Sequence, residues 1–345
     1  MVERGKSTQA EILSQPEAWQ VAIEALEGCT EELSWISSRE PYEGVIFIGC
    51  GSTYYLASSA AALLGEVSAQ PARAFPASEL WLHPSAAYSR QESLLLVAIS
   101  RSGETTETIR ACEAFLEARR GRLLTITCVP GSKLSSMGSL NIILPSGQED
   151  SIAQTRSFSC MYLAATLLAA AWNGERGTCQ ALKQLPSRAG YLLQAYAPLA
   201  KQLGGDTSIE RFYFLGSGPR YGLACELSLK MKEMSLSHSE PFHFLEFRHG
   251  PISMATQGAM IIALLSEKNR QPEAALLDEV RAQGARTLSI GQDQAEVVFN
   301  SPLDENFNNV LYLPVGQMLA YERAMQRGLN PDRPENLKAY VTLEI

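Results

Sequence analysis

Basic runs and long apolar runs are scarce in this sequence of 345 residues. Lys and Arg total 29 against 37 Asp and Glu, the net charge is −8, and the longest basic run is the pair Arg119-Arg120. A general nucleic-acid binder needs a basic surface that neutralises phosphates, so we expect no nucleic-acid partner. The longest apolar stretch, residues 161–172, is too short to span a bilayer. We therefore expect a buried helix there and no membrane partner.

Paired cysteines, histidine and a secretory leader are also missing or rare. The 7 cysteines are scattered without a CxxC pair, and residues 1–20 contain no apolar core of a signal peptide. An odd cysteine count without a leader predicts reduced thiols in a cytoplasmic protein. Three of the 4 histidines lie between residues 238 and 249, without an HExxH spacing. One functional and two structural histidines are favoured over a metal site, and we expect neither a metal nor an organic cofactor.

The clearest feature of the sequence is an internal repeat. Residues 45–57 (VIFIGCGSTYYLA) resemble residues 212–224 (FYFLGSGPRYGLA), with the glycines, one tyrosine and one alanine in register. Two further pairs follow in the same order: LLLVAIS (94–100) with MIIALLS (260–266), and NIILP (141–145) with VLYLP (310–314). Features that recur in order at near-constant spacing predict a duplicated domain.

Short apolar runs alternate with helical patterns in both halves. Runs such as 45–48 and 94–99 are typical of buried parallel strands, and a helical pattern such as 106–119 separates one run from the next. This alternation predicts βαβ units and an α/β fold. We expect four parts: a helical segment at 1–29, a first domain at 30–175, a second domain at 190–330 and an extended C-terminal tail at 331–345.

A loop rich in hydroxyl groups follows the apolar run at 94–99. It reads Ser100-Arg101-Ser102-Gly103-Glu104-Thr105 and precedes a helical pattern. Backbone N–H groups at a helix start, hydroxyl donors and a glycine suit a phosphate, although the same residues could simply cap the helix. The corresponding residues 266–269 (SEKN) contain no hydroxyl cluster. We therefore expect one anion site, in the first half.

Three charged residues, Glu226, Lys230 and Glu233, share one face of a predicted helix because they are four and then three residues apart. Such a row is commonly a solvated stripe of ion pairs. Here the helix directly follows the GSG turn at 216–218, a region where α/β proteins hold ligands, and its other residues are largely apolar. A partly buried acid–base site is therefore the competing interpretation.

Five motifs together resemble the double sugar isomerase (SIS) domain family. The order and spacing are similar to the isomerase half of glucosamine-6-phosphate synthase and to stand-alone SIS-type glucosamine-6-phosphate deaminases, from about residue 40 to residue 345. The resemblance implies two flavodoxin-like SIS domains, each a five-stranded parallel sheet flanked by helices. It also implies a homodimer, which would cover apolar helices such as 161–172. The motifs are GCGSTYY (49–55), ISRSGETTET (99–108), TRSFS (155–159), ELSLKMKE (226–233) and LEFRHGP (245–251).

The same resemblance assigns roles to residues of this chain. It implies that His249 opens the sugar ring, acting from the neighbouring subunit, and that Glu233 moves a proton between C1 and C2. Glu226 and Lys230 would support that site. The residue types suit these tasks, because histidine titrates near neutral pH and a carboxylate can accept and return a proton. The implied contacts to the phosphate and the sugar are Ser52, Thr53, Ser100, Arg101, Ser102 and Thr105.

The resemblance weakens in the tail and in the sugar pocket. The position of the family's sugar-contacting lysine holds Ala339, and Lys338 lies one residue earlier. In an extended segment a shift of one residue points the side chain the opposite way. Gln154 and residues 243–245 also differ from the synthase pattern. These departures leave the substrate less determined than the family.

The expected reaction is an isomerising deamination in which glucosamine 6-phosphate and water give fructose 6-phosphate and ammonia. The segment before the start of the resemblance, about 40 residues, is expected to be too short for a glutaminase domain, which favours the breakdown direction. The alternatives are a plain ketose/aldose phosphate isomerase or a deglycase of sugar-phosphate–amine adducts. A non-catalytic sugar-phosphate sensor is less favoured, because Glu233 and His249 are both present.

Overall fold

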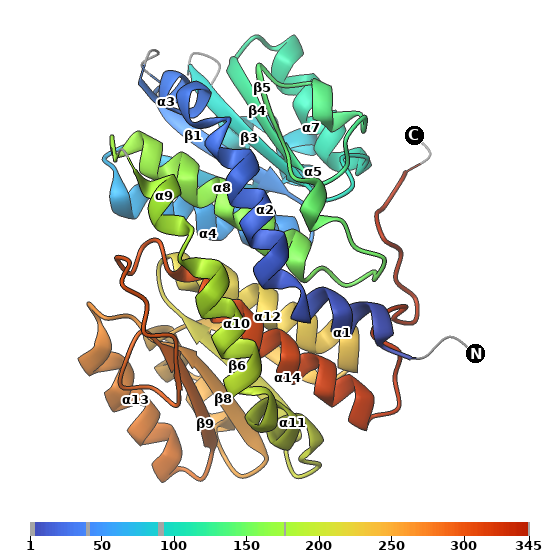
Figure 1. Cartoon of the computed structure of the whole chain (residues 1–345). Helices are drawn as coiled ribbons and strands as arrows, with labels where there is room; N and C mark the ends of the chain where they lie inside the picture. The colour runs from blue at the N-terminus through green and yellow to red at the C-terminus, as the bar shows by residue number, and fades with distance from the viewer. Residues whose placement is uncertain (1–3, 39–41, 89–92, 176, 344–345) are drawn as a thin grey trace. The chain divides into compact units, whose positions relative to one another are not determined.

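The computed structural model describes residues 4–38, 42–88, 93–175 and 177–343 (Figure 1). The chain divides into two compact units. We call them the first-sheet unit (residues 17–149, 156–183 and 338–345) and the second-sheet unit (residues 1–16, 150–155 and 184–337). Each unit therefore combines segments that are far apart in the sequence.

Five parallel strands form the first sheet, in the order β2-β1-β3-β4-β5. Every residue of β1 and β3 is buried, which explains why both strands are continuous apolar runs and do not alternate with polar residues. The predicted α/β class and five-stranded sheet are confirmed. The bounds are β1 Gly44–Gly49, β2 Ala72–Pro76, β3 Leu94–Ser100, β4 Gly121–Thr127 and β5 Leu140–Ile143.

Helices cover both faces of the first sheet (Figure 1). Helices α4 and α8 pack together on one face, and α5 and α7 share a hydrophobic core with alternate residues of β1 and β3 on the other. Helices α2 and α3 precede the sheet. The bounds are α2 Gln15–Glu27, α3 Thr30–Ser38, α4 Ser52–Val67, α5 Ala77–Leu82, α6 Pro84–Ala87, α7 Thr106–Glu117, α8 Arg156–Trp172 and α9 Thr178–Leu182, with 3₁₀ turns η1 Leu134–Ser136 and η2 Pro145–Gly147.

Helix α8 is the buried helix predicted from the apolar stretch at 161–172. Its residues 157–170 are all buried, and it packs on α3 and α4 of its own unit. The Tyr162 hydroxyl accepts a hydrogen bond from Ser59 of α4 at 2.9 Å, and the Trp19 indole donates to Ser159 at 2.7 Å. The expectation that this helix needs a second subunit to cover it is therefore wrong, because α3 and α4 already do so.

The second sheet has the same strand order as the first. Read from its equivalent edge, it runs β7-β6-β8-β9-β10, and every pair described is parallel. Both sheets thus follow the flavodoxin-like order 2-1-3-4-5. The bounds are β6 Arg211–Gly216, β7 His238–His243, β8 Ala259–Leu264, β9 Arg286–Gly291 and β10 Val297–Val298.

The helices of the second-sheet unit repeat the arrangement of the first. Helices α12 and α14 pack together, and α13 covers the opposite face with the 3₁₀ turn η3. The approach of α14 to α12 is close, since a Cβ on Gly316 would lie 2.7 Å from Leu227 Cδ2. The bounds are α1 Lys6–Leu13, α10 Leu185–Ala195, α11 Ala197–Gly205, α12 Pro219–Ser235, α13 Arg270–Ala282 and α14 Leu313–Gln326, with η3 Leu245–Arg248, η4 Pro251–Met254 and η5 Asn309–Tyr312.

The glycine turns show the duplication in backbone detail. Gly51 has φ 57° and ψ −123°, and Gly218 has φ 55° and ψ −131°. A Cβ on Gly49 would lie 2.4 Å from the backbone of Thr53, and a Cβ on Gly216 would lie 2.3 Å from the carbonyl oxygen of Arg220. Because a side chain would clash at the same point in both turns, both halves require glycine there.

One element of the predicted repeat is wrong. NIILP at 141–145 contains β5, but VLYLP at 310–314 forms the 3₁₀ turn η5 and the start of α14. The fifth strand of the second sheet is instead the two-residue β10. A short apolar run suits a buried strand and a buried helix equally well, and Pro314 is favourable in the first turn of a helix.

Along the described residues, no helix combines the length and apolarity that crossing a bilayer requires.

Candidate active site

The predicted phosphate residues of the first-sheet unit lie at the carboxyl edge of the first sheet. Strands β1 and β3 are neighbours there, and the chain leaves β1 toward β2 on the other side. This switch in direction is where α/β folds bind ligands. Cys50 Sγ in the glycine turn lies 3.6 Å from Thr108 Oγ1 of α7. The structure therefore brings the turn after β1 and the loop after β3 together.

Hydroxyl groups shape the loop after β3, residues 100–105, which we call the phosphate loop. Ser100 Oγ accepts the Gly103 N–H at 3.1 Å and lies 3.3 Å from Thr105 Oγ1, while Ser102 Oγ accepts the Glu104 N–H at 3.2 Å. As an acceptor in that bond, the Ser102 hydroxyl keeps its proton for another partner. Gly103 has φ +67°, and a Cβ there would lie 2.1 Å from Ser132 Oγ. Glycine is therefore obligatory at this turn.

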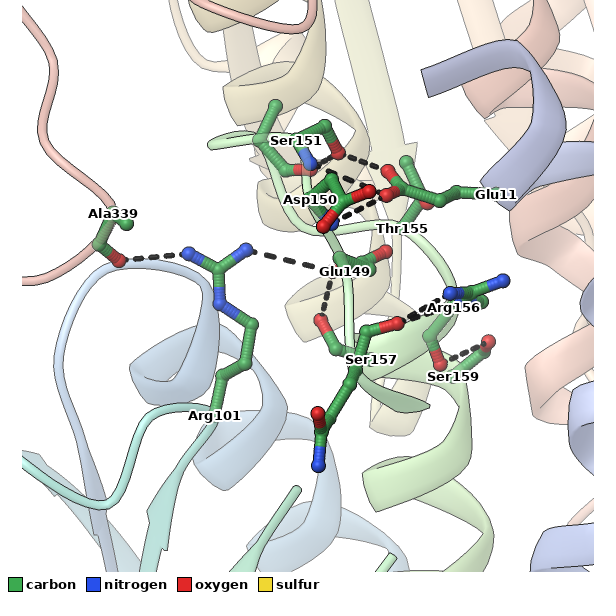
Figure 2. Close-up of polar contacts among 12 residues, drawn as sticks. Glu11, Arg101, Glu149, Asp150, Ser151, Thr155, Arg156, Ser157, Ser159 and Ala339 are labelled. Carbon is green, nitrogen blue, oxygen red and sulfur yellow. Dashed lines mark hydrogen bonds and ion pairs between the residues drawn. The ribbon is translucent and has the colours of Figure 1, made fainter. Parts of the chain in front are cut away.

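Arg101 is held between a buried carboxylate and the C-terminal tail (Figure 2). Its Nη1 lies 3.5 Å from Glu149 Oε2, and its Nη2 donates to the carbonyl oxygen of Ala339 at 2.7 Å. The Glu149 side chain is fully buried and also accepts the hydroxyl of Ser157 at the start of α8. Glu149 thus fixes the Arg101 guanidinium, and Arg101 fixes the tail.

Ser52 and Thr53 begin α4, and both are buried. Thr53 Oγ1 accepts the Cys50 N–H at 2.9 Å and donates to the Cys50 carbonyl at 3.0 Å. The Thr53 hydroxyl therefore closes the glycine turn. Burial raises the pKa of the Cys50 thiol to about 11, so this cysteine is a thiol and not a thiolate at neutral pH.

The tail contacts the start of α7. The carbonyl oxygen of Val341 accepts the Thr106 N–H at 3.3 Å, and the Leu343 N–H donates to Thr106 Oγ1 at 3.0 Å. Lys338 is exposed. The residue that touches the phosphate loop is thus Ala339, through its backbone, at the position where the sequence comparison expected the family's lysine.

Glu226, Lys230 and Glu233 form a buried cluster on α12. Lys230 Nζ lies 3.3 Å from Glu226 Oε1 and 2.5 Å from Glu233 Oε2. The side chains of Lys230 and Glu226 are fully buried, whereas that of Glu233 is 21% exposed. A solvated stripe is therefore excluded, and Glu233 is the member of the cluster that is partly exposed to solvent.

Two opposing effects act on Lys230. Burial alone would lower its pKa, but the carboxylates of Glu226 and Glu233 outweigh burial and raise the pKa above its ordinary value. The lysine therefore remains protonated at neutral pH, and its charge holds both carboxylates in place.

The position of the cluster along α12 differs from the expectation. Glu226 lies seven residues after Pro219, which at 1.5 Å per residue is about 10 Å from the helix start. The first turn of α12, with Arg220 and Tyr221, is the part that follows the carboxyl end of β6. The cluster is thus distinguished from a surface stripe by its burial, and not by closeness to that end of the strand.

His249 is exposed and ends η3. Its backbone N–H donates to the Glu246 carbonyl at 2.9 Å, and the next residue, Gly250, has φ +115°. Leu245 and Met254 in the same segment are 42% and 50% exposed. His249 therefore stands on an exposed loop with apolar neighbours.

The other two histidines of this region have structural contacts. His243 stacks on Tyr221 with ring centroids 3.7 Å apart, and its pKa is lowered by burial, partly opposed by Glu246. His238 lies 3.4 Å from Glu240. Within the described ranges, no group of three or more His, Cys, Asp or Glu side chains is arranged to hold a metal ion.

Sequence reasoning missed the residues that support Arg101 and the phosphate loop. Glu149 is a single acid in a loop and carries no spacing signal, and Ser132 is found only through its closeness to Gly103. Arg220 could have been found, because the repeat aligns it with Thr53 of the first half.

Comparisons with known proteins agree with this architecture. A glutamine–fructose-6-phosphate aminotransferase (isomerizing) from Pyrobaculum aerophilum is 30% identical over 353 residues, covering 97% of this chain and 57% of the relative. The chain spans about half the length of the curated relatives it matches.

Two solved structures are similar over nearly the whole chain. Glucosamine-6-phosphate deaminase from Thermotoga maritima has a TM-score of 0.82 and 27% identity, covering 98% of this chain and 100% of that one. Tagatose-6-phosphate ketose/aldose isomerase from Escherichia coli shares the fold, with a TM-score of 0.84, 22% identity and coverage of 96% and 95%. The SIS domain family itself matches residues 43–171 and 207–319, one stretch on each sheet, and the chain therefore belongs to the SIS domain family.

Proposed function

We propose that this SIS protein is an isomerising amino-sugar-phosphate deaminase, which converts glucosamine 6-phosphate and water to fructose 6-phosphate and ammonia. The observation that carries the proton transfer in this proposal is the buried cluster on α12. A protonated lysine 2.5 Å from Glu233 Oε2 positions one partly exposed carboxylate, which is the arrangement that a proton transfer between adjacent carbons requires. The similarity to the Thermotoga maritima deaminase over the full chain supports the choice of substrate.

In this proposal the phosphate loop binds the substrate phosphate. The hydroxyls of Ser100, Ser102 and Thr105 and the start of α7 supply donors, and Arg101 supplies a positive charge. Ser52 and Thr53 line the same edge through the adjoining turn. The phosphate does not react, so its binding energy serves to orient the sugar.

The proton transfer is then carried by Glu233. His249 opens the pyranose ring, which exposes the C1 aldehyde. Glu233 removes the proton from C2 and returns it to C1. In the same step the C1 oxygen takes up a second proton and the amino nitrogen gives one up, so that C1 becomes a hydroxymethyl carbon and C2 an imine. Water adds to the C2 imine, the C–N bond breaks, and fructose 6-phosphate and ammonia leave. Lys230 and Glu226 position the base, and Lys338 supports the open-chain sugar from the tail.

We further propose that the active protein is a homodimer in which His249 serves the partner's site. Its exposure and the exposed Leu245 and Met254 in the same segment favour a partner surface at this loop. Sedimentation at the assay concentration tests this, and an active monomer would contradict it.

A second candidate function is ketose/aldose phosphate isomerisation without loss of nitrogen. The α12 cluster favours it to the same degree, since moving a proton between C1 and C2 is the whole of that reaction. The two reactions differ only in whether C2 carries nitrogen or oxygen.

The test is ammonia release, coupled to glutamate dehydrogenase, across a panel of hexosamine and hexose phosphates. We expect ammonia and fructose 6-phosphate in equal amounts from glucosamine 6-phosphate. In D₂O, exchange of the transferred proton should place deuterium at C1 of the product. Interconversion of hexose phosphates with no ammonia from any hexosamine phosphate would contradict the deaminase and establish the isomerase.

A further inference from the structure

The second-sheet unit contains a loop that matches the phosphate loop in its place after the third strand and in one hydrogen bond. Residues 266–269 follow β8 and precede α13, at the switch point formed by β6 and β8. Ser266 Oγ accepts the Asn269 N–H at 3.0 Å, just as Ser100 Oγ accepts the Gly103 N–H at 3.1 Å. We call residues 266–269 the second loop.

Carboxylates of the protein itself occupy the backbone donors of the second loop. The Ser266 N–H donates to Glu273 Oε2 and the Glu267 N–H donates to Glu305 Oε2, each at 2.7 Å. Glu305 comes from the segment between β10 and η5 and is only 6% exposed. An anionic group of the chain thus sits at the place that corresponds to the proposed phosphate position of the first-sheet unit.

Two cations face the same carboxylate. Arg220 Nη1 lies 3.9 Å from Glu305 Oε2, and Lys268 Nζ lies 3.9 Å from Glu305 Oε1. Arg220 is 5% exposed and occupies the position that Thr53 has in the first glycine turn. Three positive or donor groups therefore converge on the Glu305 carboxylate, as the donors of an anion site do. They are the backbone N–H of Glu267 and the charged side chains of Arg220 and Lys268.

Arg220 is the observation that points to a larger anion than a carboxylate. Its guanidinium donates no hydrogen bond to any other residue in the described part of the chain, and its Nε is buried without a partner there. A distance of 3.9 Å is an ion pair but is too long for a hydrogen bond. Buried guanidinium groups ordinarily donate to an acceptor, and a tetrahedral oxyanion offers more acceptor oxygens than one carboxylate.

We propose that the second loop is an oxyanion site that the protein keeps closed with the carboxylate of Glu305. Without that carboxylate the site binds inorganic phosphate, through the Glu267 N–H, Arg220 and Lys268. The wild-type chain therefore binds no phosphate at the second loop. This inference does not depend on the proposed reaction. The second loop, Arg220 and Glu305 all belong to the second-sheet unit, and none of them has a role in the proposed reaction.

The test compares the full chain with Glu305→Ala in inorganic phosphate, by titration calorimetry and thermal unfolding. We expect the variant to bind one more phosphate per chain than the wild type. We also expect phosphate to raise the melting temperature of the variant more than that of the wild type, because a ligand of the folded state stabilises it. Asp278→Ala removes the same charge from an exposed position of α13, where the side chain is 77% exposed, and should add no site.

Two further variants keep the test decisive. Adding Arg220→Met to Glu305→Ala should abolish the additional phosphate. Glu305→Gln keeps an acceptor for the Glu267 N–H but loses the charge, so phosphate should bind it more weakly than it binds Glu305→Ala. If Glu305→Ala folds only in the presence of phosphate, the proposal is supported. If neither the Ala nor the Gln variant gains phosphate binding or phosphate-dependent stability, or if the gain persists without Arg220, the proposal is overturned.

Discussion

Helices α4 and α12 follow the same glycine turn in the two halves of the repeat, yet they carry different chemistry. The repeat aligns Glu226 with Ser59, Lys230 with Leu63 and Glu233 with Glu66. The first two positions are fully buried in both helices. Small or apolar side chains suit such positions, and Ser59 bonds to Tyr162 of the neighbouring helix. Burying two ions at the same positions costs desolvation, so the α12 cluster is better explained by chemistry than by stability.

The two loops after the third strand of each sheet differ in a complementary way. The phosphate loop presents hydroxyls, whereas the second loop is filled by Glu273 and Glu305. In the proposed function, the first-sheet unit binds the phosphate and the second-sheet unit supplies the base. In that proposal, divergence of the two halves separates phosphate binding from proton transfer.

Grafting the α4 residues onto α12 gives the largest expected effect. Lys230→Leu alone leaves the buried charge of Glu226 without its lysine and should lower the free energy of unfolding by about 3–5 kcal/mol. The double change Glu226→Ser with Lys230→Leu removes that charge and should recover most of the loss while remaining inactive. Urea unfolding of both variants measures this. Equal instability of the single and double variants would show that the comparison of α4 with α12 is misleading.

The second largest effect should come from replacing Glu233, the proposed base of the second-sheet unit. Glu233→Gln keeps the shape and a hydrogen bond to Lys230 but cannot accept the proton, so kcat should fall about 10²-fold or more. Ammonia release at saturating glucosamine 6-phosphate measures it. Glu240→Gln, on β7, serves as a control that should retain activity. A Glu233→Gln enzyme with near-normal kcat would remove α12 from the mechanism.

Hydroxyl groups in equivalent turns should have unequal effects on binding. Ser102→Ala in the phosphate loop should weaken substrate binding by about 1–3 kcal/mol, the range for a hydrogen bond to a charged group, and Thr105→Ala should act in the same direction. Ser266→Ala in the second loop should leave KM unchanged. Steady-state kinetics with glucosamine 6-phosphate distinguishes the two loops. If KM is normal in both first-loop variants, the substrate phosphate binds elsewhere.

The filled second loop should make stability depend on pH. Burial raises the pKa of Glu273 to about 7, although the Ser266 N–H and the nearby arginines oppose the shift. The folded state then keeps a proton that the unfolded chain releases near pH 4.5, so the contribution of Glu273 to stability should fall as pH rises from about 4.5 to 7. Glu273→Gln, which cannot ionise, should show a smaller fall in chemical unfolding over that interval. Asp278→Asn should follow the wild type.

The smallest effect on substrate binding should come from changing Glu149, the carboxylate that holds Arg101. Glu149→Gln keeps the size of the side chain but removes the charge beside Arg101, which loosens the guanidinium and the tail it holds. We expect KM to rise by about 2- to 5-fold, or about 0.4–1 kcal/mol of binding, with kcat little changed, because Arg101 keeps its charge and its bond to Ala339. Glu113→Gln, which breaks the exposed pair with Lys133, is the matched control. A large fall in kcat would instead place Arg101 in the chemistry.

The α/β class, the duplication and most of the strands could be predicted from the residues alone. Continuous apolar runs can be buried only in a sheet covered on both faces, and glycines in register indicate the same turn twice. Where the run was ambiguous, at 310–314, the prediction failed, because periodicity cannot separate a short buried strand from the start of a buried helix. The spacing of Glu226, Lys230 and Glu233 placed them on one face but left their exposure open.

Which of these groups are buried, and which residues they contact, depends on how the chain packs in three dimensions. The packing of α14 and β7 on α12 turns a charged row into a buried cluster. The folding of distant segments onto the two switch points sets Ala339 against Arg101, Glu149 behind it, and Glu305 in the second loop. Contacts between residues so far apart in sequence depend on how helices and loops pack, and no local pattern of residues records them.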